Sequence, residues 1–106
     1  MRKGEYVIAK SNSPSGEDYQ ERIEGKAYLV RDTITCEGCS DIAINIGGVT
    51  DKSYAQCGCG HMQMSDGKKW TTTECFDYLS KNNVSAAIEY ALEEEDYELC
   101  VKIRDV

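Results

Sequence analysis

Two cysteine-rich stretches decide how the rest of this chain is arranged: Cys36-Glu37-Gly38-Cys39 and, after 17 intervening residues, Cys57-Gly58-Cys59-Gly60. The first stretch holds a CxxC pair and the second a CxC pair, and glycines in both allow tight turns around the sulfurs. A structural zinc ion takes four thiolate or imidazole ligands in a tetrahedron, usually as two close pairs from separate turns. The spacing therefore predicts a structural Zn²⁺ site whose ligands are Cys36, Cys39, Cys57 and Cys59.

Other uses of the cysteines stay open on the sequence alone. Six cysteines in 106 residues also suit a disulfide framework or reduced core thiols, and four thiolates also hold iron–sulfur clusters. His61 lies two residues beyond Cys59 and offers an imidazole that would replace Cys57 as the fourth ligand. Because Met1-Arg2-Lys3 opens a segment without an apolar signal core, we expect a cytoplasmic protein whose thiols stay reduced.

The size and charge of the chain narrow the classes of function. A chain of 106 residues forms one small domain, or a domain with an appendage, and its core is marginal without a structural metal. The formal net charge is −7, concentrated in residues 85–106, and an acidic chain is repelled by phosphate backbones. We therefore expect no nucleic-acid partner. No apolar run approaches the roughly 20 residues that span a bilayer, so we expect no membrane association.

Short β-prone segments surround both cysteine pairs. Ile42, Ile44 and Ile46 alternate with small or polar residues, which predicts a strand with its isoleucines toward the core. Residues 11–18 are expected to form a surface loop, residues 65–67 a hairpin turn and residues 74–79 a further short turn. The segments predicted as strands are 5–10, 25–32, 41–46, 53–57 and 69–73.

Glycine and aromatic residues on either side of the cysteines follow a second pattern. A Gly-x-x-Tyr-x-Val strand precedes the cysteines, and a Gly-x-x-Trp strand with a later aromatic residue follows them. The residues concerned are Gly25, Tyr28, Val30, Gly67, Trp70 and Phe76. This arrangement resembles the small SH3-like barrels of bacterial proteins, which implies about five short strands with a zinc knuckle inserted. We expect Trp70, the sole tryptophan, to be a core or barrel-end residue.

Residues 81–106 have a different periodicity. Their apolar positions fall first on one face of a helix, at Val84, Ala87, Ile88, Ala91 and Leu92. This spacing predicts a helix over residues 84–94, with Asn83 as its N-cap. Between residues 97 and 105 apolar and polar residues alternate, which is a strand pattern, although a helix would also place Tyr97, Cys100 and Val101 on one face. Periodicity leaves helix and strand open there.

The order of residue types near the C-terminal end is more specific. An acidic turn precedes Tyr97-Glu98, then Cys100-Val101, then Lys102-Ile103-Arg104-Asp105. This order resembles the UVR motif of the excision-repair proteins UvrB and UvrC, in which two small residues stand at the positions of Cys100 and Val101. The resemblance implies an antiparallel helical hairpin that mediates protein–protein contact, and it favours a second helix over a strand.

A cysteine-rich metal module followed by such a hairpin is also similar in order to the McsA family of adaptors, which regulate a protein kinase partner. Those adaptors repeat CxxC pairs, whereas this chain has one CxxC and one CxC pair. We expect an α+β fold: a small antiparallel, SH3-like β-barrel or sheet with an inserted zinc knuckle, then a C-terminal helix or helical hairpin. Two units are expected, a zinc-stabilised β domain over residues 1–80 and a UVR-like helical segment over residues 81–106.

The function expected from these patterns is that of a non-enzymatic adaptor, a cytoplasmic bacterial protein that holds a structural zinc ion and binds a protein partner. An alternative is a redox- or metal-responsive regulator, in which oxidation of the thiolates releases the zinc. A cysteine enzyme has less support, because His61 is the only histidine that could act as a base for Cys75. Otherwise Cys75 and Cys100 are expected to be small buried hydrophobic residues.

Overall fold

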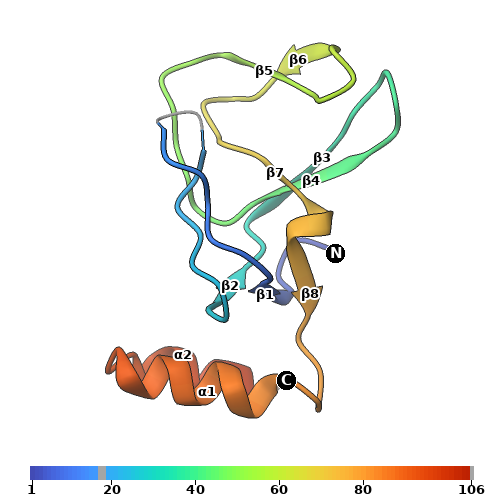
Figure 1. The fold of residues 1–106 in the computed structure, drawn as a ribbon. Coiled ribbons are helices and arrows are strands. Elements are labelled where there is room, and N and C mark those ends of the chain that lie inside the picture. Colours follow the sequence, from blue (N-terminus) through green and yellow to red (C-terminus); the bar gives the residue numbers. More distant parts are fainter. Residues whose placement is uncertain (17–18, 106) are drawn as a thin grey trace.

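The computed structural model describes residues 1–16 and 19–105, and it confirms the α+β class. In the described part of the chain, short strands connected by longer loops lie before residue 80, and two helices follow (Figure 1). The predicted loop over residues 11–18 lies partly outside the described residues, as does the end of the predicted helical segment. The elements are β1 (Tyr6–Ala9), β2 (Ala27–Leu29), β3 (Asp32–Thr35), β4 (Ile42–Asn45), β5 (Tyr54–Gln56), β6 (Met62–Met64), β7 (Thr71–Thr72), the 3₁₀ turn η1 (Thr73–Cys75), β8 (Phe76–Tyr78), α1 (Val84–Glu93) and α2 (Tyr97–Arg104).

The strands form three antiparallel sheets, with the orders β2-β1-β8, β3-β4-β7 and β5-β6. In the first sheet β1 is central, and its Val7 lies opposite Tyr28 of β2 and Tyr78 of β8. In the second sheet β4 is central and pairs with β3 and β7. The third sheet is a hairpin at the end of the molecule that is farthest from the helices (Figure 1).

One apolar cluster joins the first two sheets. Its buried side chains are Val7, Ala9, Val30, Ile44 and Phe76. Strand alternation explains the contribution of β1, because residues two apart on a strand point to the same side. Burial of a large apolar side chain stabilises a fold by about 1.5–3 kcal/mol, so this cluster is a main source of stability for the two sheets.

A buried glutamine fastens the loop before β2 to the second sheet. Gln20 is 1% exposed, and its Nε2 donates to the carbonyl oxygen of Ile44 and to Thr71 Oγ1, both at 2.9 Å. Its Oε1 accepts the backbone N–H of Ile46 at 3.0 Å. Gly48 is required beside it, because a Cβ there would lie 2.4 Å from the Cβ of Gln20. A buried amide with these partners fixes one packing arrangement of the loop.

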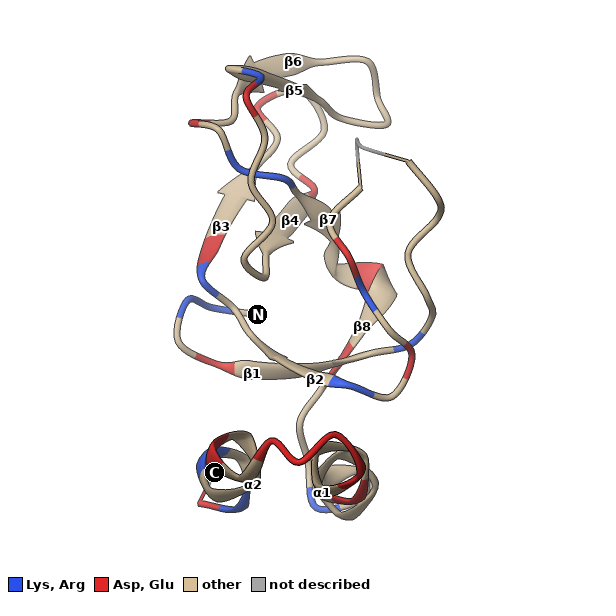
Figure 2. Ribbon diagram, turned by 90° about the vertical axis from the view of Figure 1, so that its left-hand side faces the viewer, with Lys and Arg blue, Asp and Glu red and all other residues tan. Residues whose placement is uncertain are grey.

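The two helices cover the other face of the first sheet, where they lie side by side (Figure 2). The side chains buried between helices and sheet are Ile8, Ala27, Ala87 and Ile103. Ile8 faces the helices because its neighbours on β1 face the other cluster. An ion pair between Lys26 Nζ and Glu94 Oε2, at 3.1 Å, also connects the sheet to the end of α1.

The structure resolves the ambiguity over residues 97–105 in favour of a helix. Asp96 caps α2, since its side chain accepts the backbone N–H of Leu99 at 3.2 Å. In the helix Ile103 is buried, whereas Tyr97 and Val101 are exposed, so the alternating pattern does not reflect a strand. Among the residues that the structure describes, no helix combines the length and apolar character that a bilayer crossing requires.

Three local predictions need correction. Residues 74–79 were expected to form a turn, but Phe76–Tyr78 is a strand, because pairing with β1 lets Phe76 enter the first core cluster. The predicted isoleucine face is only partly buried, since Ile42 near the cysteines is 43% exposed while Ile44 is fully buried. Asn83 occupies the N-cap position of α1, but its side chain donates to the carbonyl of Tyr78 and accepts from the N–H of Ser80 rather than from the helix.

Candidate metal centre

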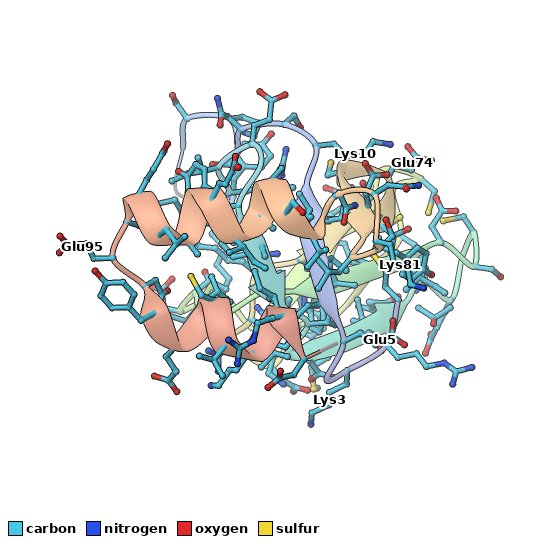
Figure 3. The ribbon with its side chains drawn as sticks, turned by 90° about the horizontal axis from the view of Figure 1, so that it is seen from below. Lys3, Glu5, Lys10, Glu74, Lys81 and Glu95 are labelled. Carbon is cyan, nitrogen blue, oxygen red and sulfur yellow. The ribbon has the colours of Figure 1, made fainter. Side chains whose placement is uncertain are left out.

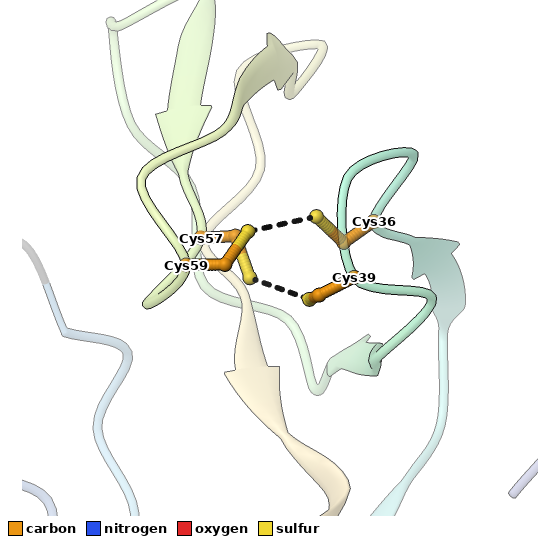
Figure 4. A group of neighbouring side chains, drawn as sticks. All are labelled: Cys36, Cys39, Cys57 and Cys59. Carbon is orange, nitrogen blue, oxygen red and sulfur yellow. Dashed lines mark hydrogen bonds between the residues drawn. The ribbon is translucent and has the colours of Figure 1, made fainter.

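The two cysteine pairs, 17 residues apart in the sequence, meet at one point in space (Figure 4). Cys36 and Cys39 lie in the turn between β3 and β4, and Cys57 and Cys59 lie in the turn between β5 and β6. All four Sγ atoms are within 4.8 Å of one another. Two turns from different sheets therefore bring together the four residues that the spacing singled out as ligands.

The distances between the sulfurs suit a metal ion rather than disulfide bonds. Cys36 Sγ lies 3.5 Å from Cys59 Sγ, and Cys39 Sγ lies 3.5 Å from Cys57 Sγ. A disulfide needs about 2.05 Å, and all six cysteines are free thiols in the structure. With a zinc–sulfur bond of about 2.3 Å, the sulfurs of a regular tetrahedron are about 3.8 Å apart. The observed spacing therefore leaves room for one ion at the centre of the four.

Each cysteine turn is closed by a backbone hydrogen bond to its first cysteine and ends in a residue with a positive φ. In the first, Ser40 N donates to the carbonyl oxygen of Cys36 at 2.8 Å, and Ser40 has a φ of +65°. In the second, Gly60 N donates to the carbonyl oxygen of Cys57 at 2.9 Å, and Gly60 has a φ of +94°. A left-handed residue after the last cysteine turns the chain back toward the strand. Glycine adopts this conformation readily, whereas serine does so at a cost.

The turns pack directly against each other. A Cβ on Gly38 would lie 3.0 Å from His61 Cβ and 3.4 Å from Cys59 Sγ, so glycine is needed for this close approach. The side chain of Gln63 bridges the hairpin to the first turn. Its Oε1 accepts the backbone N–H of Glu37 at 3.1 Å, and its Nε2 donates to the carbonyl oxygen of Thr35 at 3.0 Å.

Sequence reasoning missed Gln63, although a signal was present. The alternation Met62-Gln63-Met64 places Gln63 on the opposite face of β6 from both methionines. Both methionines are exposed at about 60%, so the hairpin turns its polar residue inward and its apolar residues outward. This inverted pattern indicates that the inner face of the hairpin is stabilised by contacts other than an apolar core.

His61 lies beside the cluster and is not one of its members. Its Nε2 is 3.8 Å from Glu37 Oε2 of the first turn. The structure thus includes Cys57 in the cluster and places the His61 imidazole between the two turns. The remaining cysteines lie elsewhere and are half-buried: Cys75 Sγ is 3.8 Å from Thr72 Oγ1, and Cys100 Sγ donates to the carbonyl oxygen of Ile88 at 3.7 Å.

The sulfurs differ in how readily they lose a proton. The backbone N–H of Cys39 and, more weakly, that of Gly38 lower the pKa of Cys36 to about 6. The backbone N–H of Asp41 lowers the pKa of Cys39, but the neighbouring sulfurs of Cys57 and Cys36 outweigh it and raise that pKa to about 12. The first turn therefore supplies one thiolate at neutral pH. A cation between the sulfurs would favour loss of the other protons.

Comparisons with known proteins found no relative of this chain. No family model matches the chain, and no curated protein or solved structure matches it either. The role of the four cysteines therefore has to follow from their own geometry and from the surfaces around them.

Proposed function

We propose that the chain is a non-enzymatic protein-interaction adaptor in which Cys36, Cys39, Cys57 and Cys59 hold one structural Zn²⁺. The observation that carries the metal part is the convergence of four sulfurs within 4.8 Å from two turns of separate sheets. A second fact supports it: neither β5 nor β6 has a buried residue, so the hairpin needs another source of stability. A two-stranded hairpin alone is marginally stable in water, and zinc binding contributes directly to folding.

The donor set favours zinc in a structural role. Thiolates suit zinc, which accepts a tetrahedral arrangement without a redox change. Four protein ligands leave no open coordination position for water or substrate, and a catalytic zinc requires one. For this reason we infer a fastening role for the ion, and a non-enzymatic role for the chain.

The partner is proposed to bind the outer face of the α1–α2 hairpin, which Figure 3 shows from below. Three large apolar side chains of the two helices are exposed: Leu92 at 48%, Tyr97 at 63% and Val101 at 47%. Exposed apolar residues on a helix pair support a docking surface. The acidic turn between the helices, residues 93–96, suits a partner with basic residues at the matching position. The UVR-like residue order supports the same role.

A redox- or metal-responsive regulator is the second candidate, and the exposure of Cys39 and Cys59 favours it. Hydrogen peroxide can reach these sulfurs from solvent. Oxidation of Cys39 and Cys57 to a disulfide, with peroxide reduced to water, would remove two of the four ligands and release the metal. Zinc release at low peroxide doses, together with loss of partner binding, would support this candidate.

The metal part of the proposal is tested by metal analysis of purified protein followed by a thermal melt with and without chelator. One zinc per chain and a lower melting temperature after chelation are expected. Zinc well below one per chain, with an unchanged melting temperature, would refute the structural role.

The adaptor part is tested by cross-linking and affinity capture with point variants of the hairpin. Removal of residues 81–106 is unsuitable, because it would expose Ile8 and Ala27 of the sheet. Leu92→Asp and Val101→Asp should abolish capture of a specific partner, while the matched variant Val49→Asp, at a residue 76% exposed on the β part, should not. Equal capture by all three variants would contradict docking through the helices.

A further inference from the structure

A groove runs along β5 that neither the metal centre nor the helical hairpin uses. It has a volume of about 600 Å³ and is bordered by Tyr54 and Gln56 of β5 and by Lys69 and Trp70. Tyr19 also lines it. Strands β5 and β6, which contribute to its lining, lie at the end of the molecule away from the helices (Figure 1).

At two positions of β5, the backbone N–H and C=O groups point away from β6, the strand with which β5 pairs. Ser65 N donates to the carbonyl oxygen of Ser53, and Cys57 N donates to that of His61, both at 2.8 Å. Hydrogen-bonded and non-bonded pairs alternate in an antiparallel ladder, so Tyr54 and Gln56 direct their N–H and C=O groups away from β6. Within residues 1–16 and 19–105, these four groups have no hydrogen-bond partner.

The walls of the groove combine aromatic surface with positive charge. Lys68 and Lys69 line it beside Tyr54 and Trp70, and none of its described lining residues is acidic. Lys68 is neutralised by an ion pair with Asp32. Lys69 Nζ donates to the backbone oxygen of Tyr19 at 3.3 Å, a neutral acceptor that leaves its charge available. The groove therefore attracts anionic groups beside apolar ones.

We propose that an extended acidic peptide segment of a partner protein binds here as an additional strand on the edge of β5. Its backbone pairs with the outward N–H and C=O groups of Tyr54 and Gln56. Side chains of an extended peptide alternate in direction, so carboxylates on one side reach Lys69 while apolar side chains on the other contact Trp70. This surface is separate from the helical hairpin of the proposed function, and each is tested by its own variants.

Two observations favour a peptide over other occupants. Unpaired strand-edge groups are matched by another peptide backbone and not by phosphates. The net charge of −7 opposes a polynucleotide, which would bring many more negative charges than a short acidic segment. A second copy of this chain would bring the same lysines to the edge, so like charges oppose self-pairing.

The experiment is an NMR and fluorescence titration of the full zinc-loaded chain with an acetylated, amidated hexapeptide of alternating glutamate and valine. Binding should shift the amide resonances of Tyr54 and Gln56 and change the emission of Trp70, the sole tryptophan, at up to about 1 mM peptide. Affinity should fall with added salt. The lysine–valine hexapeptide is the charge-reversed control and should leave the spectra unchanged.

Two pairs of variants measure separately how much the backbone pairing at Gln56 and the charge of Lys69 contribute to peptide binding. Gln56→Pro removes an outward N–H that β6 does not use, and it should weaken binding about tenfold, whereas Gln56→Ala keeps this N–H and should weaken binding much less. Lys69→Glu should weaken binding by about threefold or more, whereas Lys81→Glu, at the distant residue labelled in Figure 3, should not. Zinc content and the amide spectrum of the helices verify that each variant is folded.

Several outcomes would overturn the proposal. Absence of any shift with the acidic peptide would do so, as would equal binding of the lysine–valine peptide. The same shifts with oligothymidylate would indicate a nucleic-acid groove, and shifts that follow protein concentration without peptide would indicate self-pairing. None of these outcomes alters the result with Leu92→Asp and Val101→Asp, so the two proposals fail separately.

Discussion

The two ends of this molecule are held together by different means. At the helical end, Ile8 and Ala27 of the sheet and Ala87 and Ile103 of the helices are buried against one another. At the cysteine end, every residue of β5 and β6 is exposed or half-exposed, and the inner face carries Gln63. The first arrangement is an ordinary apolar core, and the second depends on four sulfurs and a few hydrogen bonds.

This difference indicates how a small chain divides its sources of stability. Apolar burial at one end needs no ligand and persists under all conditions that keep the chain folded. A metal-fastened end gains its stability only when the ion is present, so it responds to metal supply and to oxidants. The helical end of the chain can therefore stay folded under conditions that loosen the cysteine end.

The largest expected effect is the loss of a sulfur ligand. Cys57→Ser should reduce zinc from one per chain to near zero and lower the melting temperature by about 10–20 °C, because the hairpin loses its main fastening. Elemental analysis and calorimetry measure both quantities. Cys75→Ser is the matched control, since Cys75 lies outside the cluster, and it should retain full zinc. Full zinc in the Cys57 variant would show that Cys57 is not a ligand and that the ion does not hold the hairpin.

The reverse experiment weakens the apolar end. Ile103→Ala removes a fully buried side chain and should lower the free energy of unfolding by about 2–5 kcal/mol. Zinc stoichiometry should stay at one per chain, because the ion lies at the opposite end. Denaturant unfolding and elemental analysis check the two parts. Coupled loss of zinc would mean that the ends are not independent.

A smaller effect is expected at the bridge between hairpin and first turn. Gln63→Ala removes two hydrogen bonds, to Glu37 and Thr35, and should weaken zinc affinity by about 1–3 kcal/mol. Competition with a chromophoric chelator measures that affinity. Met64→Ala, at an exposed residue next to Gln63 on the same strand, is the matched control and should change it little. Equal effects of both variants would show that the bridge is not important.

The smallest effect concerns pH and the metal-free protein. The pKa of Cys36 is lowered to about 6, chiefly by the backbone N–H of Cys39, while an unfolded thiol titrates near about 8.5. A depressed pKa contributes stability that is fully present above about pH 8.5 and is lost as the pH falls through about 6. The Cβ resonance of Cys36 in zinc-free protein should titrate near 6. A midpoint near 8.5 would show that the first turn melts together with the hairpin.

The sequence correctly predicted those features that depend on residues close together in the chain. Cysteine spacing placed Cys36, Cys39, Cys57 and Cys59 together, and helical periodicity located α1 within one residue. Periodicity alone failed for α2, where alternation suggested a strand, and the UVR-like residue order supplied the helix. Short motifs succeed because they encode a turn or a helix face within a few residues.

The parts that sequence reasoning missed depend on distant partners. Phe76–Tyr78 becomes a strand only because β1, almost 70 residues earlier, offers an edge. Gln20 is buried because Ile44, Ile46 and Thr71, all distant in the sequence, supply hydrogen-bond partners for its amide that no local pattern reveals. Ser40 adopts a positive φ because the turn requires it, although its residue type does not favour that conformation.

The most direct test of a metal-fastened end is hydrogen exchange of the wild-type chain with zinc bound and after chelation. Amides of residues 53–65 should lose protection without zinc, while amides of β1 and α2 should keep theirs. Uniform loss of protection across the chain, or none in residues 53–65, would contradict the claim that the ion holds this end and apolar burial holds the other.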